Sequence, residues 1–115
     1  MTHISTNHIT ASVANALQYI SYYHPPDFIE SMSRAYEREA SESAKNAIGQ
    51  ILINSRMAAE GHRPMCQDTG VVVAFIKIGQ SVVIDGDISL QNAIDEGVPQ
   101  AYTTPDNPLR ASVVS

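Results

Sequence analysis

The stretch "GVVVAFIKIGQSVVIDG", from Gly70 to Gly86, decides the fold class of this chain. Its residues are mostly apolar and β-branched, and Lys77 is the only charge before Asp85. A short run of this kind between glycines is typical of buried β-strands. We therefore predict a mostly buried strand from about Val71 to Ile78, a turn at Gly79-Gln80, and a second short strand that ends at Asp85.

The first sixty residues have a different pattern, with the apolar spacing of amphipathic helices. A first helix is expected until the two prolines that follow His24 end it. Asp27 is expected to be the N-cap of a second helix, with Glu30 three residues on as its capping-box partner. A third helix, with a buried face of small and aliphatic residues over Ala44–Ala59, is expected to stop at Gly61.

One more helix is expected after the strands, with Ser89 as its N-cap and Pro99 ending or kinking it. The final residues "ASVVS" resemble the beginning of another strand. Because a strand needs neighbours to pair with, we expect this sequence to be an incomplete N-terminal piece of a larger domain. The predicted fold class is α+β, with a helical layer over about residues 9–60 and a β-containing layer over about residues 69–115.

The composition of the chain excludes several classes of protein. The 115 residues fit one domain, and the net charge is −5 with only seven basic residues, which argues against nucleic acid and anionic membranes as partners. No run of about 18 apolar residues occurs, and the single cysteine cannot close an intramolecular disulfide. We therefore expect a cytoplasmic protein. The four histidines have no metal-ligand spacing.

The single cysteine lies in "HRPMCQDTGVV", from His62 to Val72. One interpretation is structural: Cys66 is a small buried hydrophobe, and Asp68, Thr69 and Gly70 form a turn. The alternatives are a nucleophilic thiol with His62 as base, a redox thiol, or a metal or cluster ligand. A proline separates the thiol from His62, and no second cysteine is present to resolve a disulfide. A ligand role would need further ligands from beyond residue 115.

Three segments together carry a resemblance to a known family. They are "RPMCQDTGVVVAFIKIG", "AIDEGVPQAY" and "NPLRASVV", and they resemble the N-terminal part of the class I, iron–sulfur-dependent fumarate hydratases and the related alpha subunits of tartrate dehydratase. The resemblance covers essentially the whole chain, and "PxCQDTG" is its most specific part. Pro99 departs from it, because a helix runs through the corresponding segment of the family.

The resemblance implies an iron–sulfur cofactor. In the family this cysteine is one of three ligands of a 4Fe-4S cluster, and the other two come later in the same domain. By resemblance Cys66 is a metal ligand, and the fragment cannot hold a complete cluster because it contains no other cysteine. The iron left open by three thiolates acts as a Lewis acid toward the substrate.

The resemblance also implies roles for three polar side chains. Gln67 would bind the substrate as a neutral hydrogen-bond donor, and Asp68 would be catalytic, in proton transfer. Arg110 would bind a substrate carboxylate through two parallel hydrogen bonds. Thr69 and Gly70 are expected to shape the turn.

The resulting expectation is a hydro-lyase that interconverts fumarate and (S)-malate, reactants of the tricarboxylic acid cycle. The full-length protein is expected to be a homodimer, and the fragment alone to be inactive. Tartrate dehydratase alpha subunit is the enzymatic alternative, with the same chemistry on a dihydroxy acid. A non-enzymatic assembly domain with an inert, buried Cys66 is the other alternative.

Overall fold

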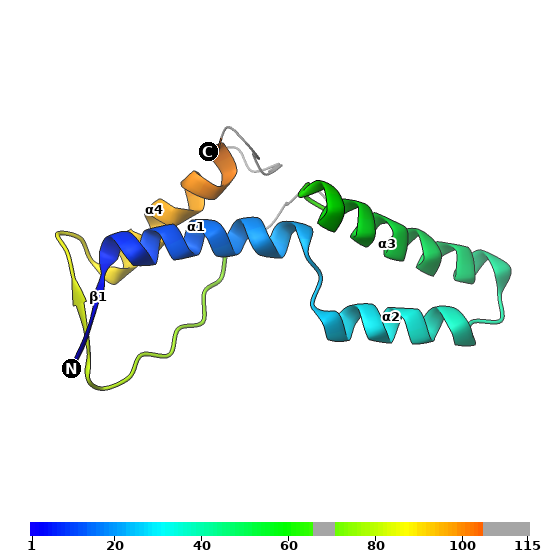
Figure 1. The fold of residues 1–115 in the computed structure, drawn as a ribbon, viewed down its shortest axis with the longest axis horizontal. Coiled ribbons are helices and arrows are strands. Elements are labelled where there is room, and N and C mark those ends of the chain that lie inside the picture. The colour runs from blue at the N-terminus through cyan, green and yellow to red at the C-terminus, as the bar shows by residue number, and fades with distance from the viewer. Residues whose placement is uncertain (66–70, 105–115) are drawn as a thin grey trace. The chain divides into compact units, whose positions relative to one another are not determined.

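The computed structural model describes residues 1–65 and 71–104. In chain order its elements are β1 (Thr2–Ser5), α1 (Thr6–Tyr22), α2 (Pro26–Arg38), α3 (Glu42–Gly61), β2 (Val82–Asp85) and α4 (Leu90–Thr103), as Figure 1 shows. The fold is α+β, mostly helical with a two-stranded parallel sheet, as the sequence predicts. The described residues belong to two compact units, residues 1–18 with 71–104 and residues 19–65.

The sheet belongs to the unit that contains the N-terminus. Strand β1 pairs in parallel with β2, in the register Thr2 to Val82 and Ser5 to Asp85. At the edge of the pair His3 Nδ1 lies 2.7 Å from an Asp85 carboxylate oxygen. The sequence predicts β2 and its end at Asp85 but not β1, because Ile4 is the only apolar residue in Thr2–Ser5.

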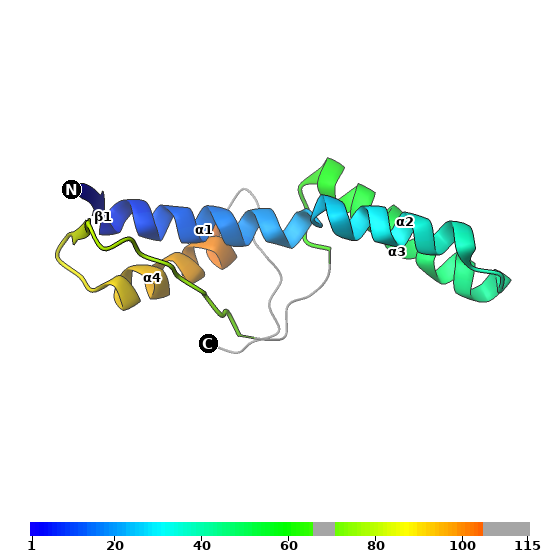
Figure 2. The same cartoon turned by 90° about the horizontal axis from the view of Figure 1, so that it is seen from below.

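Helix α4 and residues 6–18 of α1, which belong to the same unit, pack closely because small residues line their contact. Ala93 and Ala101 of α4 are fully buried, and Leu17 of α1 is nearly so. The Thr10 hydroxyl of α1 donates to the Ala93 carbonyl oxygen over 2.8 Å, which fixes one helix against the other. Figure 2 shows α4 running beside the first part of α1.

The predicted strand over Val71–Ile78 is wrong. Residues 71–79 form neither helix nor strand, and Val71 and Phe75 are 86% and 95% exposed. An apolar β-branched run becomes a buried strand only where neighbouring strands accept its hydrogen bonds, and β2 pairs with β1 instead. The turn after this segment is confirmed, since the Val82 amide donates to the Gly79 carbonyl oxygen over 3.1 Å.

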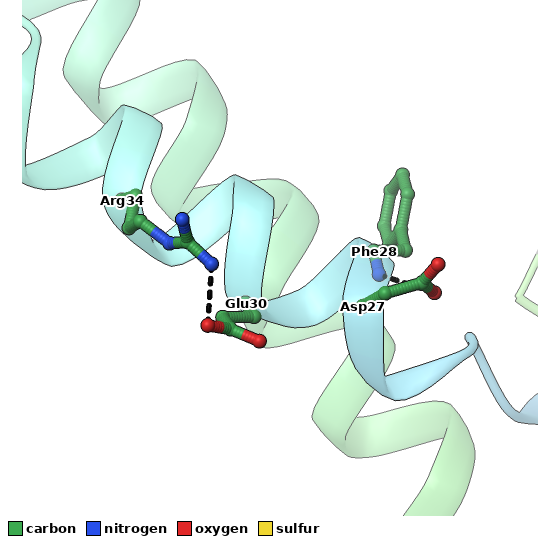
Figure 3. A network of polar contacts seen from close by, with 4 residues as sticks. All are labelled: Asp27, Phe28, Glu30 and Arg34. Atoms are coloured by element: carbon green, nitrogen blue, oxygen red, sulfur yellow. Dashed lines mark hydrogen bonds and ion pairs between the residues drawn. The ribbon is translucent and has the colours of Figure 1, made fainter.

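Helices α2 and α3 form a helical hairpin in the second unit (Figure 1). The predicted capping box at the start of α2 is wrong. The N-cap is Pro25, and Asp27 lies inside the first turn, where its carboxylate accepts from the Phe28 amide over 2.9 Å. Glu30 pairs with Arg34, one turn further on, as Figure 3 shows. The helix begins earlier than predicted because proline suits the first helical position.

Helix α3 begins two residues before the predicted Ala44, because the Ser41 hydroxyl caps it by accepting from the Ala44 amide over 3.4 Å. Its predicted buried face is only partly confirmed. Ser55 and Ala58 are buried, but Ile51 is 43% exposed. Helix α2, against which it packs, has no buried residue.

Helix α4 begins as predicted, with the Ser89 hydroxyl accepting from the Asn92 amide over 3.1 Å. Pro99 does not end it, since the helix continues to Thr103. A proline inside a helix costs about 3 kcal/mol locally. Packing against α1 on both sides of the proline, through Gly97 and Ala101, opposes that cost.

Candidate functional site

The four predicted site residues, Cys66, Gln67, Asp68 and Arg110, lie outside the described residues, as do Thr69 and Gly70. Their roles and their distances from one another therefore remain predictions. What the structure does describe is the segment that leads into Cys66, from the end of α3 to Met65. Three groups of contacts shape this segment.

The first group turns the chain out of α3. His62 caps the helix in the left-handed conformation, with φ 49° and ψ 50°. The amides of His62 and Arg63 both donate to the Ala58 carbonyl oxygen, the latter over 3.1 Å. This closes the end of the helix, where carbonyl groups otherwise lack partners. Gly61 remains the last helical residue and is not the left-handed one.

The second group holds the His62 ring, and we call it the His62 clamp: Tyr22, Tyr23 and His62. The imidazole stacks on the Tyr22 ring, with centroids 5.0 Å apart and planes 15° from parallel. Its Nε2 lies 2.9 Å from the Tyr23 hydroxyl, and which atom donates depends on the tautomer. The clamp bears on the nucleophile hypothesis, because the ring that this alternative would need as a base already has a polar partner at Nε2.

The third group fixes the residue just before the cysteine, and we call it the Met65 anchor: Ser21, Asn54 and Met65. The Met65 amide donates to the Ser21 carbonyl oxygen over 2.9 Å. The Asn54 side-chain amide donates to the Met65 carbonyl oxygen over 3.1 Å. Both backbone polar groups of Met65 therefore have partners on helices, which fixes where the chain approaches Cys66.

A second histidine stabilises the same unit. His24 Nδ1 lies 2.8 Å from the buried Ser55 hydroxyl of α3, and the His24 ring stacks on Phe28 with centroids 4.3 Å apart. Sequence patterns alone did not mark Tyr22, Tyr23 or Asn54 as important. The signal that could have found the tyrosines is the aromatic cluster "YISYYH" directly before the prolines.

Two hollows are found among the described residues of the other unit. An apolar groove of about 350 Å³ is lined by Ile4, His8, Ile9, Ser12, Val13, Ala74, Ile76, Lys77, Ile78, Gly79, Val82, Ile84, Leu90 and Ile94. A polar hollow of about 260 Å³ is lined by residues that include Asp85, Asp87 and Glu96. Within residues 1–65 and 71–104, no three His, Cys, Asp or Glu side chains are grouped so that they could hold a metal ion.

Electrostatic effects among the described residues are local. The Glu60 carboxylate accepts a hydrogen bond from Arg56 over 2.9 Å and raises the pKa of that exposed guanidinium, first through the hydrogen bond and then through its charge. This pair lies on α3, one turn apart.

Among the described residues no helix is long and apolar enough to cross a membrane.

Similarity to known proteins extends over almost the whole chain. The family model described as "Fumarate hydratase (Fumerase)" matches residues 10–115. The chain is 36% identical over 106 residues to the putative L(+)-tartrate dehydratase subunit alpha of Methanocaldococcus jannaschii, a match that covers 92% of this chain and 36% of the relative. It is 31% identical over 112 residues to the L(+)-tartrate dehydratase subunit alpha of Escherichia coli, covering 96% of this chain and 35% of the relative.

The chain thus spans about a third of the length of these relatives. The family match runs through the segment that contains Cys66 and through the segment that contains Arg110. It also runs through the end of α3, where the clamp and the anchor lie. Because the match covers all but the first nine residues, this chain belongs to the fumarate hydratase (Fumerase) family.

Proposed function

We propose that this chain is the N-terminal part of an iron–sulfur hydro-lyase that interconverts fumarate and (S)-malate. The observation that carries the proposal is the family match over residues 10–115, which includes the "CQDTG" segment. The reaction adds a hydroxyl group to one alkene carbon and a proton to the next, so the site must deliver water, move a proton and hold two carboxylates. The chain contains a suitable residue for each of the last two tasks.

A 4Fe-4S cluster fits the donor chemistry of this chain in part. Cys66 is the only cysteine, so the chain can supply one thiolate ligand, and the remaining thiolates must come from other parts of the full-length protein. When bound, such a cluster supplies an iron with an open position that polarises a hydroxyl or carboxylate oxygen of the substrate. The 115 residues alone are therefore expected to be inactive.

Three polar side chains of this chain would act on the substrate itself. The Gln67 amide would donate a hydrogen bond to a substrate oxygen. The Asp68 carboxylate would accept and return the proton that is exchanged at carbon. The Arg110 guanidinium would bind one substrate carboxylate with two parallel N–H donors, because a guanidinium is charged near neutral pH.

A second candidate substrate is tartrate, and one observation favours it: the relatives described above are named L(+)-tartrate dehydratase subunit alpha. The chemistry is the same loss of water, from a dicarboxylate that carries one more hydroxyl group. We further propose, from the family resemblance alone, that the full-length protein is a homodimer in the cytoplasm.

The test is a substrate comparison with the full-length protein that contains this chain. The protein is purified and reconstituted with iron and sulfide without oxygen, its iron content is verified, and steady-state rates are measured on fumarate, (S)-malate and L(+)-tartrate. We expect the highest kcat/KM on the fumarate–malate pair and loss of activity in air. A preference for tartrate would select the second candidate, and no hydro-lyase activity at full iron content would refute both.

A further inference from the structure

Two residues, Arg63 and Pro64, link His62 of the clamp to Met65 of the anchor. We infer that His62 is a positioning residue, which acts through Met65 to set the direction in which the chain enters Cys66. The residues that carry this role are all described: α3 supplies Asn54 and the Ala58 acceptor, and the end of α1 with the residue after it supplies the tyrosines. The inference rests on the proposed function in one respect only, namely that presenting the Cys66 thiol serves ligand binding.

The conformation of His62 is the first step. A left-handed residue at the end of a helix is usually glycine, because a side chain there costs about 1–2 kcal/mol. Here Gly61 is available but stays helical, and the left-handed position falls on His62 instead. Glycine at position 62 would adopt this conformation freely, but it has no side chain that the tyrosines could contact. The histidine adopts it and also presents a ring, which the two tyrosines contact.

The geometry of the ring is the second step. Stacking on Tyr22 fixes the plane of the imidazole, and the contact between Nε2 and the Tyr23 hydroxyl fixes its rotation within that plane. Tyr23 also meets the ring edge-on, with centroids 5.8 Å apart and planes at 72°. A ring constrained in both respects leaves the His62 backbone little freedom, so the exit direction from α3 is determined.

The link from His62 to Met65 is the third step. Pro64 lies within it and restricts its own φ to near −65°, so the link has few soft torsions. At its end the Met65 amide and carbonyl group are each held, by Ser21 and by Asn54. The link is therefore fixed at both ends, and the next residue is Cys66. Asn54 is exposed, and its described bond is to this backbone, which suits a role in the link more than one in the core.

The test uses the full-length protein with four variants. Tyr23→Phe removes only the hydroxyl, His62→Asn keeps a residue that tolerates the left-handed conformation but removes the ring, and the third variant combines both. Tyr36→Phe is the matched control, because it removes a hydroxyl from α2 in the same unit. Two quantities are measured without cluster: the hydrogen-exchange rate of the Met65 amide, and the rate at which N-ethylmaleimide alkylates Cys66, followed on its peptide by mass spectrometry.

We expect Tyr23→Phe to speed hydrogen exchange of the Met65 amide by about 2- to 10-fold, which corresponds to the net free energy of one hydrogen bond. Alkylation of Cys66 should speed up by a similar factor. His62→Asn should have at least this effect. The double variant should be no faster than His62→Asn alone, since both changes remove the same contact. A general loss of stability would instead lower the melting temperature and act additively, and Tyr36→Phe should leave both rates within about twofold of the wild type.

A third measurement separates this inference from the proposed function. In reconstituted protein, the rate of iron loss to a chelator should rise in Tyr23→Phe while the melting temperature stays unchanged. If the wild type holds no iron but exchange and alkylation respond as described, the proposed function fails and the positioning role stands. Unchanged Met65 exchange and unchanged Cys66 alkylation in folded Tyr23→Phe and His62→Asn would overturn the positioning role, whether or not the protein binds iron.

Discussion

Gly97 is the residue that allows α1 and α4 to approach closely, and Gly97→Ala tests this directly. A Cβ atom at position 97 would lie 2.7 Å from the Thr10 carbonyl oxygen and 2.7 Å from Val13 Cβ. Carbon atoms prefer separations of about 3.5–4.0 Å, so the helices would have to move apart by nearly 1 Å. Both contacts are with backbone or Cβ atoms, which cannot rotate away.

The magnitude follows from three terms. Overpacking of a tight contact costs about 1–3 kcal/mol. Separation of the helices also weakens the bond from the Thr10 hydroxyl to the Ala93 carbonyl oxygen, worth about 1 kcal/mol. Alanine regains about 1 kcal/mol of helix propensity over glycine. The α1–α4 contact should therefore lose about 1–3 kcal/mol, although the same change at an open helical position would be stabilising.

Gly49→Ala in α3 is the matched control. There the nearest atom to an added Cβ is Tyr36 Cε2 at 3.3 Å, the edge of a partly exposed ring that can shift. The assay is native-state hydrogen exchange on peptides of α1 and α4, in the full-length protein. Gly97→Ala should speed exchange there by about 5- to 140-fold, and Gly49→Ala should not. Unchanged exchange in Gly97→Ala, or equal effects of the two substitutions, would refute the close-packing argument.

Three further predictions concern the cap of α4 and the proposed site. Ser89→Ala should cost about 1 kcal/mol and speed exchange of the Asn92 amide, which donates to the serine hydroxyl; no change would mean that water replaces the cap. Cys66→Ser in the full-length protein should abolish retention of iron after anaerobic reconstitution, and a variant with normal iron content and activity would exclude the ligand role. Arg110→Lys should leave iron content unchanged and weaken substrate binding by about 1.5–3 kcal/mol, seen as a raised KM, because lysine lacks the planar fork. Wild-type kinetics in that variant would make Arg110 a surface residue.

Much of the secondary structure could be predicted from the sequence because its signals act over a few residues. The helical spacing, the cap at Ser89 and the turn after Gly79 depend only on local side chains, and the structure has all three. The "CQDTG" segment was also recognisable in the sequence, and the family match includes it. The predicted start of α2 was wrong because both Asp27 and Pro26 favour a helix start. The helix begins at Pro26, which leaves Asp27 inside its first turn.

Only the tertiary structure decided the features that join distant parts of the chain. Strand β1 forms because Thr2–Ser5 pairs with Val82–Asp85, and no local sequence pattern predicts that pairing. The apolar run after Gly70 has the composition of a strand, yet among the described residues no strand pairs with it, so composition alone could not settle its state. The His62 ring likewise contacts tyrosines that lie about forty residues earlier in the chain. Sequence patterns report what a segment prefers, whereas these features depend on which partner is within reach.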